Sequence, residues 1–293
     1  MLLVMLLSCS KEQIDLAERI PAGLTDGFCL VIGDSLLITH EEISHYDLST
    51  HMVYFKEEQE FLRDRINLDM AYNTFRVFAG RDSIYGGPFY PMWSSSIFPG
   101  PCIHWPSFYP PYALSIQLGY PWPNGPAENG DPRSDSRILT ALEQFDQLRQ
   151  GLMCTIDEIQ VLQGGGVEFS FTVNNLDEEN YYVLSPEKMG HGLYHYFTNG
   201  LYLWSEATSY LENGMVHEAP QEGWDISWMD LLEGGTSLSY TLTYSNFEAI
   251  PPGTYDASFR LPGLSWVDQG KLHRAGGSIW LGYVYAQSAV TIN

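Results

Sequence analysis

The sequence predicts a mainly β protein, with an α+β domain over residues 26–154 followed by an antiparallel β-sandwich over residues 155–293. Two observations carry this prediction. Short apolar or alternating runs recur along the chain between turns rich in Gly, Pro and Asn. Only one segment repeats its apolar residues at helical spacing. A length of 293 residues also suits two domains of ordinary size.

Composition excludes several classes of protein. Hydrophobic residues make up 44% of the chain and aromatic residues 14%, which is enough apolar material to exclude wholesale disorder. The formal charge is −22, from 14 Lys and Arg against 36 Asp and Glu. Such a surface repels phosphate backbones, so we expect no nucleic-acid partner. It suits a basic partner, divalent cations or solubility alone.

The amino terminus has the features of an export signal. An apolar run from Met1 to Leu7 is followed by Ser8, Cys9 and a polar tract. The segment 6–9 resembles the lipobox of bacterial lipoproteins, in which the cysteine is acylated and becomes the first residue. The resemblance implies a signal peptide over 1–8, lipidation of Cys9 and a tether over 9–25. It also implies a lipid-anchored protein of the outer membrane, facing the periplasm or the cell surface.

One feature departs from the lipobox pattern, because no Lys or Arg precedes the apolar run. Either the true start lies upstream, or the chain is cytosolic and begins with an apolar strand. No later stretch reaches the ~18 apolar residues of a membrane span. The other cysteines are Cys29, Cys102 and Cys154, with no CxxC spacing that would indicate a zinc or redox site.

Strands of the first domain follow in order. Runs at 28–32 and 36–38 flank the turn at Gly33-Asp34, 52–55 forms a third strand, and 75–78 with 84–87 forms a hairpin through Gly80. Between residues 88 and 132 lie 11 of the 17 prolines, which predicts a long loop with short strands at 102–104 and 114–118.

This proline-rich stretch also supplies the candidate binding residues. Aromatic rings on stiff loops offer large contact areas and lose little entropy on binding. The alternative is that the rings cap the core of the first domain. The candidate contact residues are Tyr90, Trp93, Trp105, Tyr109 and Trp122.

The helical pattern begins at Asp131-Pro132-Arg133-Ser134 and ends at Gly151. Its apolar face predicts packing against the sheet of the first domain. That face comprises Ile138, Leu139, Leu142, Phe145 and Leu148.

The second half reads as strands throughout. We expect them at 167–173, 237–242, 255–261 and 279–292, with a further hairpin of 193–197 and 201–204 around Asn199-Gly200. Short strands at this spacing favour a sandwich.

Three segments of the second half resemble immunoglobulin-like (Ig-like) modules, and two of them resemble the intracellular proteinase inhibitor group. They are 171–175, 232–240 and 251–255, the last ending in Tyr255 as a candidate corner tyrosine. The resemblance covers residues 155–293 and implies an Ig-like sandwich. Protease inhibition is one function that it would allow, although no residue is identifiable as a reactive loop.

An esterase is the alternative function. Gly33-Asp34-Ser35-Leu36 resembles the nucleophile block of GDSL-type esterases. The Asp-x-x-His block and the oxyanion block of that family are missing, and so are the alternating helices of its fold.

Histidines offer no clear metal site. His40, His45 and His51 are expected at the surface beside a strand, without the HExxH spacing of zinc enzymes. The glycines around His191 and His195 argue against a helix that would align the two rings. We predict no metal and no cofactor.

Residues 189–259 contain nine carboxylates and no Lys or Arg, which favours a solvated acidic face. Trp204, Trp224 and Trp228 in this segment form either a sugar- or peptide-binding platform or part of a core, and Trp204 is expected in the core. Together these features predict a non-enzymatic, surface-tethered lipoprotein that binds a protein or a glycan.

Overall fold

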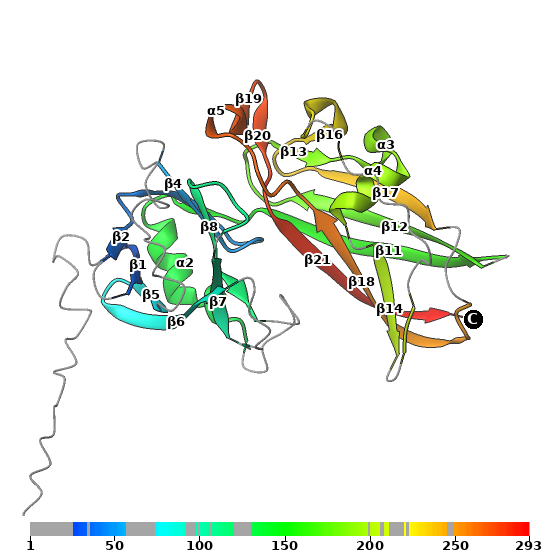
Figure 1. The fold of residues 1–293 in the computed structure, drawn as a ribbon, viewed down its shortest axis with the longest axis horizontal. Helices are drawn as coiled ribbons and strands as arrows, with labels where there is room; N and C mark the ends of the chain where they lie inside the picture. Colours follow the sequence, from blue (N-terminus) through cyan, green and yellow to red (C-terminus); the bar gives the residue numbers. More distant parts are fainter. Residues whose placement is uncertain are drawn as a thin grey trace, which may run out of the picture.

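The structure is a computed structural model, and it describes a mainly β protein with few helices (Figure 1). None of the helices that it describes is long and apolar enough to cross a membrane. The described residues are 26–33, 36–56, 74–91, 98, 100–105, 107–119, 130–163, 165–198, 200–205, 208–210, 220, 223–244 and 249–292.

Among its described residues, the amino-terminal half has two sheets and one α-helix. A six-stranded sheet has the order β2-β1-β5-β6-β7-β9, and a four-stranded sheet has the order β10-β3-β4-β8. The predicted hairpin with Gly80 at its turn is confirmed, as are the strands at 28–32, 36–38 and 52–55. The strands are β1 Phe28–Ile32, β2 Leu36–Thr39, β3 Ile43–Asp47, β4 Met52–Phe55, β5 Thr74–Ala79, β6 Asp82–Pro91, β7 Pro101–Trp105, β8 Ala113–Ser115, β9 Gln117–Leu118 and β10 Leu148–Arg149.

The predicted helix forms but is shorter than expected. A 3-10 turn, η4 (Pro132–Ser134), leads into α2 (Ser136–Glu143), whose N-cap Asp135 accepts a hydrogen bond from the backbone of Arg137. Beyond the helix, the side chain of Gln147 donates to two backbone carbonyls at 2.6 Å, and Leu148 begins β10 beside β3. Tertiary pairing therefore ends the helix before its apolar pattern does.

The carboxyl-terminal half contains three sheets. Their orders are β11-β12-β17, β15-β14-β18-β21 and β16-β13-β20-β19. The ring centroids of Phe169 and Phe171 of β12 lie 5.1 and 4.6 Å from that of Phe259 of β18. The first two sheets therefore face each other across a core of aromatic side chains. The strands are β11 Leu152–Leu162, β12 Gly166–Asn175, β13 Tyr181–Leu184, β14 Leu201–Ser205, β15 Thr208–Tyr210, β16 Met229–Leu232, β17 Ser237–Tyr244, β18 Gly253–Pro262, β19 His273–Arg274, β20 Gly277–Ile279 and β21 Tyr283–Ile292.

Two details of this half bear on the sequence predictions. The hydroxyl of Tyr255 donates to the carbonyl of Pro251 at 2.7 Å, as expected for a corner tyrosine. Strand β11 begins at Leu152, so it runs across the domain boundary predicted at residue 154.

The strand predicted at 193–197 is wrong, because these residues are helical. Helix α4 (His191–Phe197) follows the short α3 (Pro186–Met189), with Gly190 between them at a φ of +77°. A glycine adopts this backbone conformation without strain. Two remaining short helices are η5 (Ile226–Trp228) and α5 (Gln269–Leu272).

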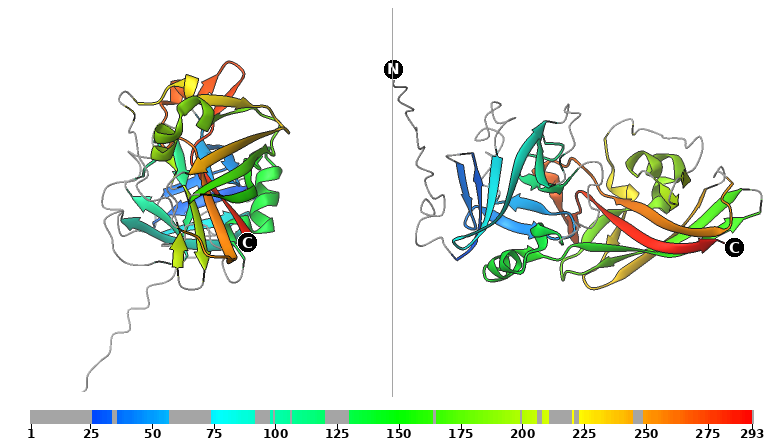
Figure 2. Two further views of the ribbon diagram at one scale, coloured as in Figure 1. Left: turned by 90° about the vertical axis from the view of Figure 1, so that its right-hand side faces the viewer. Right: turned by 90° about the horizontal axis from the view of Figure 1, so that it is seen from below.

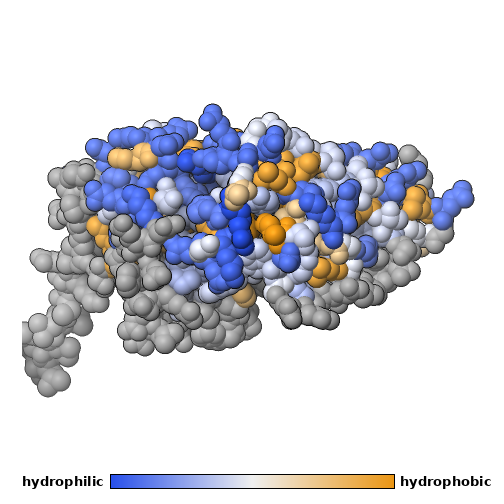
Figure 3. All heavy atoms as spheres, turned by 90° about the horizontal axis from the view of Figure 1, so that it is seen from above, coloured by the Kyte–Doolittle hydropathy of each residue, from blue (hydrophilic) through white to orange (hydrophobic). Residues whose placement is uncertain are grey.

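The two halves are joined through a shared core. Met52, Tyr54 and Tyr112 of the amino-terminal half belong to the same buried cluster as the sheets of the carboxyl-terminal half. The hydroxyl of Tyr112 donates to the carbonyl of Val267 at 2.6 Å. The strands of the two halves lie end to end in an elongated body (Figure 2). Seen from above, apolar groups on the described surface are separated by polar ones (Figure 3).

Candidate functional site

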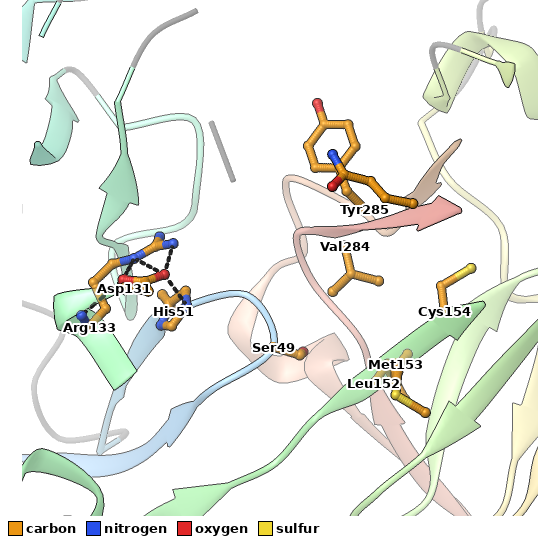
Figure 4. A pocket seen from close by; sticks show the side chains of 10 residues that line it. Ser49, His51, Asp131, Arg133, Leu152, Met153, Cys154, Val284 and Tyr285 are labelled. Carbon is orange, nitrogen blue, oxygen red and sulfur yellow. Dashed lines mark hydrogen bonds and ion pairs between the residues drawn. The ribbon is translucent and has the colours of Figure 1, made fainter. Parts of the chain in front are cut away.

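A cavity of about 310 Å³ lies where the two halves meet. One wall comes from the β3–β4 turn and the segment before α2, and the other from β11 and β21 (Figure 4). We call this cavity the cleft. Its lining residues are Ser49, His51, Asp131, Arg133, Leu152, Met153, Cys154, Val284, Tyr285 and Gln287.

A buried polar cluster forms the amino-terminal wall of the cleft. Nδ1 of His51 lies 2.8 Å from the hydroxyl of Tyr46, and Nε2 lies 3.5 Å from a carboxylate oxygen of Asp131. Arg133 pairs with the same carboxylate at 2.6 Å through Nη2 and donates through Nη1 to the carbonyl of Ile116. These contacts lock the wall into one geometry.

The electrostatics of this cluster favour a neutral histidine beside a fixed ion pair. Burial opposes ionisation of Asp131, but hydrogen bonds from His51 and Arg133 hold the pKa of its carboxyl well below the usual range. Burial lowers the pKa of His51, and this effect outweighs its hydrogen bond to Asp131. Both ring nitrogens of His51 face protein partners, so neither is available to a substrate as a base.

The backbone of His51 is strained. Its φ is +53°, a conformation that costs energy for any residue with a Cβ. The residue is only 8% exposed, so its surroundings hold it there. Strain of this kind concentrates at functional sites.

Ser49 does not act as a nucleophile beside His51. Its hydroxyl donates to Asp47 at 2.6 Å. The same carboxylate accepts bonds from the backbone of Thr50 at 3.1 Å and from the indole of Trp280 at 3.2 Å. A serine activated by an adjacent base is therefore not assembled in the cleft.

The opposite wall is mostly apolar, with Tyr285 and Gln287 as its polar members. Burial raises the pKa of the Cys154 thiol to about 12, so the thiol is protonated at neutral pH and a poor nucleophile. With fixed polar groups on one wall and mostly apolar side chains on the other, the cleft offers a ligand both kinds of contact.

The predicted contact residues are only partly described. Trp105 and Tyr109 are 7% and 8% exposed and belong to buried clusters, which leaves little ring surface for a partner. Tyr90 is half-buried, in β6. Cys9, Trp93 and Trp122 lie outside the described residues.

The proposed esterase nucleophile Ser35 also lies outside them. The strands on either side, β1 and β2, pair antiparallel. The strand-to-helix order of an α/β hydrolase is not seen there.

Sequence reasoning misplaced several other side chains. His40 and His51, expected at the surface, are each 8% exposed. His191 and His195 do align on a helix, with ring centroids 4.1 Å apart. Trp204, expected in a core, is half-buried on the outer face of β14, opposite the buried Leu203. No group of three metal-ligating side chains occurs in the described part of the chain.

The cleft itself was missed because its residues are far apart in sequence. His51 and Asp131 are separated by a proline-rich stretch, and no motif links them. The only local sign of the site was an acid and a base two residues apart, Asp131 and Arg133. No family model, curated protein or solved structure matches this chain.

The buried neutral His51 predicts a specific pH dependence. Its folded pKa lies below the ordinary 6.5, so the folded state binds fewer protons than the unfolded state, and stability falls as pH drops below about 6.5. In His51→Gln, the loss of stability between about pH 7 and pH 5 should shrink by up to about 1.4 kcal/mol per pH unit. Urea denaturation at several pH values measures this slope.

Part of the slope should persist in this variant, because burial also lowers the pKa of half-buried His45 to about 3. If the pH dependence of the unfolding free energy is unchanged in His51→Gln, the pKa of His51 is the same in the folded and unfolded states, which contradicts the prediction.

Proposed function

We propose that this protein is a non-enzymatic binding lipoprotein of the bacterial outer membrane, which holds a protein or glycan ligand in the cleft. The observation that carries the proposal is the construction of the cleft. Residues from both halves line a cavity of about 310 Å³, and the polar groups on its amino-terminal wall are held by bonds within the protein. A preformed cavity of this size lies at the small end of the range for ligand sites.

Binding is favoured over catalysis by the state of the reactive groups in the cleft. The histidine has both ring nitrogens engaged, the serine hydroxyl bonds to Asp47, and the thiol of Cys154 is protonated at neutral pH. Acid–base or nucleophilic chemistry requires at least one such group to be directed at a substrate.

The Ig-like identity of the second half is part of the same proposal. Two facing sheets and the corner bond of Tyr255 support it. In this role the sandwich is a rigid frame that presents β11 and β21 to the cleft. Protease inhibition would be one form of such binding.

The anchor is proposed from the lipobox alone. Acylation of Cys9 and a tether over residues 9–25 would hold the folded part near a membrane surface. The charge of −22 would limit non-specific adhesion of that part to anionic headgroups.

Blocking the cleft should weaken binding. Gln287 lines the cleft and is exposed on β21, so Gln287→Trp should fill the cavity without disturbing a core. Ligands that wild-type protein binds on glycan and peptide arrays should bind the variant at least about tenfold more weakly. Ala289→Trp, two residues further on the same strand and outside the cleft lining, is the matched control and should bind normally. Equal binding by both variants would place the ligand elsewhere.

Removing the lipidation site should release the protein from the membrane. Cys9→Ser, expressed in a bacterium that lipidates its exported proteins, should move the chain from the detergent phase to the aqueous phase. Mass spectrometry of the wild type should find a diacylated Cys9 as the first residue. A wild-type chain with Met1 still attached would refute the anchor.

A further inference from the structure

Arg260 is an unusual cation in this acidic protein. It is the first Lys or Arg after a stretch of 71 residues, 189–259, that holds nine carboxylates. In the described ranges, three Lys or Arg side chains are not exposed: Arg133, Arg149 and Arg260. Arg133 pairs with Asp131, and Arg149 pairs with Glu179 at 2.9 Å. Arg260 forms no ion pair with any described residue.

The guanidinium of Arg260 is held in place without a carboxylate. It lies over the ring of Tyr283, 4.1 Å from the ring centroid. The backbone carbonyl of Arg260 accepts a bond from the Thr198 hydroxyl at 2.7 Å. Nε of Arg260 is enclosed without an acceptor, whereas its two Nη atoms are not among the enclosed atoms. The Nη edge is therefore the part that an anionic group can reach.

Arg260 lies beside the cleft. In the antiparallel pair of β18 and β21, Arg260 is directly opposite Tyr285, and Ser258 is directly opposite Gln287. Directly opposite residues share a face of the sheet. Tyr285, which Figure 4 labels, and Gln287 both line the cleft. Arg260 does not line the cavity itself, but it is the strand neighbour of a lining residue on the same face, so a ligand that extends from the cleft across β21 towards β18 would meet its guanidinium.

A strip of aromatic rings continues this face away from the cleft. Tyr202 of β14 is directly opposite Ser258, so it shares the face of Arg260. The rings of Tyr202 and Trp204 lie 5.9 Å apart with an interplanar angle of 18°. Half-buried, nearly parallel rings of this kind can contact the C–H faces of sugar rings.

We propose that the ligand of the cleft is an acidic oligosaccharide, with a sugar carboxylate bound by Arg260 and sugar rings resting on Tyr285 and Tyr202. This inference rests on the proposed function of the cleft. An arginine presents two parallel donors to one carboxylate, which is the strong form of such a pair. The formal charge of −22 disfavours anions over the protein as a whole, so the attraction of a sugar carboxylate depends on Arg260 itself.

Calorimetric titration of the full chain in detergent tests this assignment with matched probes. The probes are tetragalacturonate and tetramannuronate, each paired with the neutral oligosaccharide made by reducing its carboxyl groups. Wild-type protein should bind at least one of the acids about tenfold or more tightly than its reduced partner. Arg260→Gln should bind the acid only as well as the wild type binds the reduced sugar. Arg274→Gln, at an exposed arginine next to Trp224, should behave as wild type.

Several outcomes would overturn the proposal. They are equal affinity of wild-type protein for acidic and reduced sugars, no binding of either acid, and unchanged affinity in Arg260→Gln. Binding of a tetraglutamate peptide but of no uronate would make the partner a protein instead. Arg260→Lys keeps the charge and should bind the acid with intermediate affinity. Thermal melting of each variant shows whether a loss of binding comes from a loss of folding. If Gln287→Trp weakens the binding of array ligands and Arg260→Gln does not, the proposed binding function holds and this inference is wrong.

Discussion

The buried contact between Asp47 and Trp280 is the constraint on which the arrangement of the molecule depends. The indole of Trp280, from the segment between β20 and β21, donates to the Asp47 carboxylate at the end of β3. Burial raises the pKa of Asp47, and bonds from Ser49 and Thr50 offset part of that cost. Breaking such a contact would leave a buried polar group unpaired, which is more costly than the bond is favourable.

Close packing around this bond leaves little freedom between the halves. Gly282 has a φ of +97°, and a Cβ built on it would lie 3.0 Å from Thr50 and 3.2 Å from Met52. A residue with a side chain would be strained there by its backbone and crowded by its neighbours. The β3–β4 turn that carries His51 is therefore fixed against the carboxyl-terminal half, and the cleft exists because the turn is fixed.

Local patterns predicted most of the strands but not the site. The alternation at 167–173 and the hairpin through Gly80 are local features, and they formed as expected. Residues 193–197 were misread because Gly190, taken as a helix breaker, instead lies just before α4 as its N-cap. Trp204 was expected to be the tryptophan that Ig-like sandwiches bury in their core, but its neighbour Leu203 is the buried residue at this point of β14. The cleft depends on contacts between distant segments, which periodicity does not encode.

If the halves are fixed by this interface, they should unfold together. Differential scanning calorimetry of the full chain should then produce one transition, with a calorimetric enthalpy equal to the van't Hoff enthalpy. Two separate transitions would show that each half is stable without the other. The cleft would then be a loose gap between two independent domains, which would contradict a fixed interface around Asp47 and Trp280.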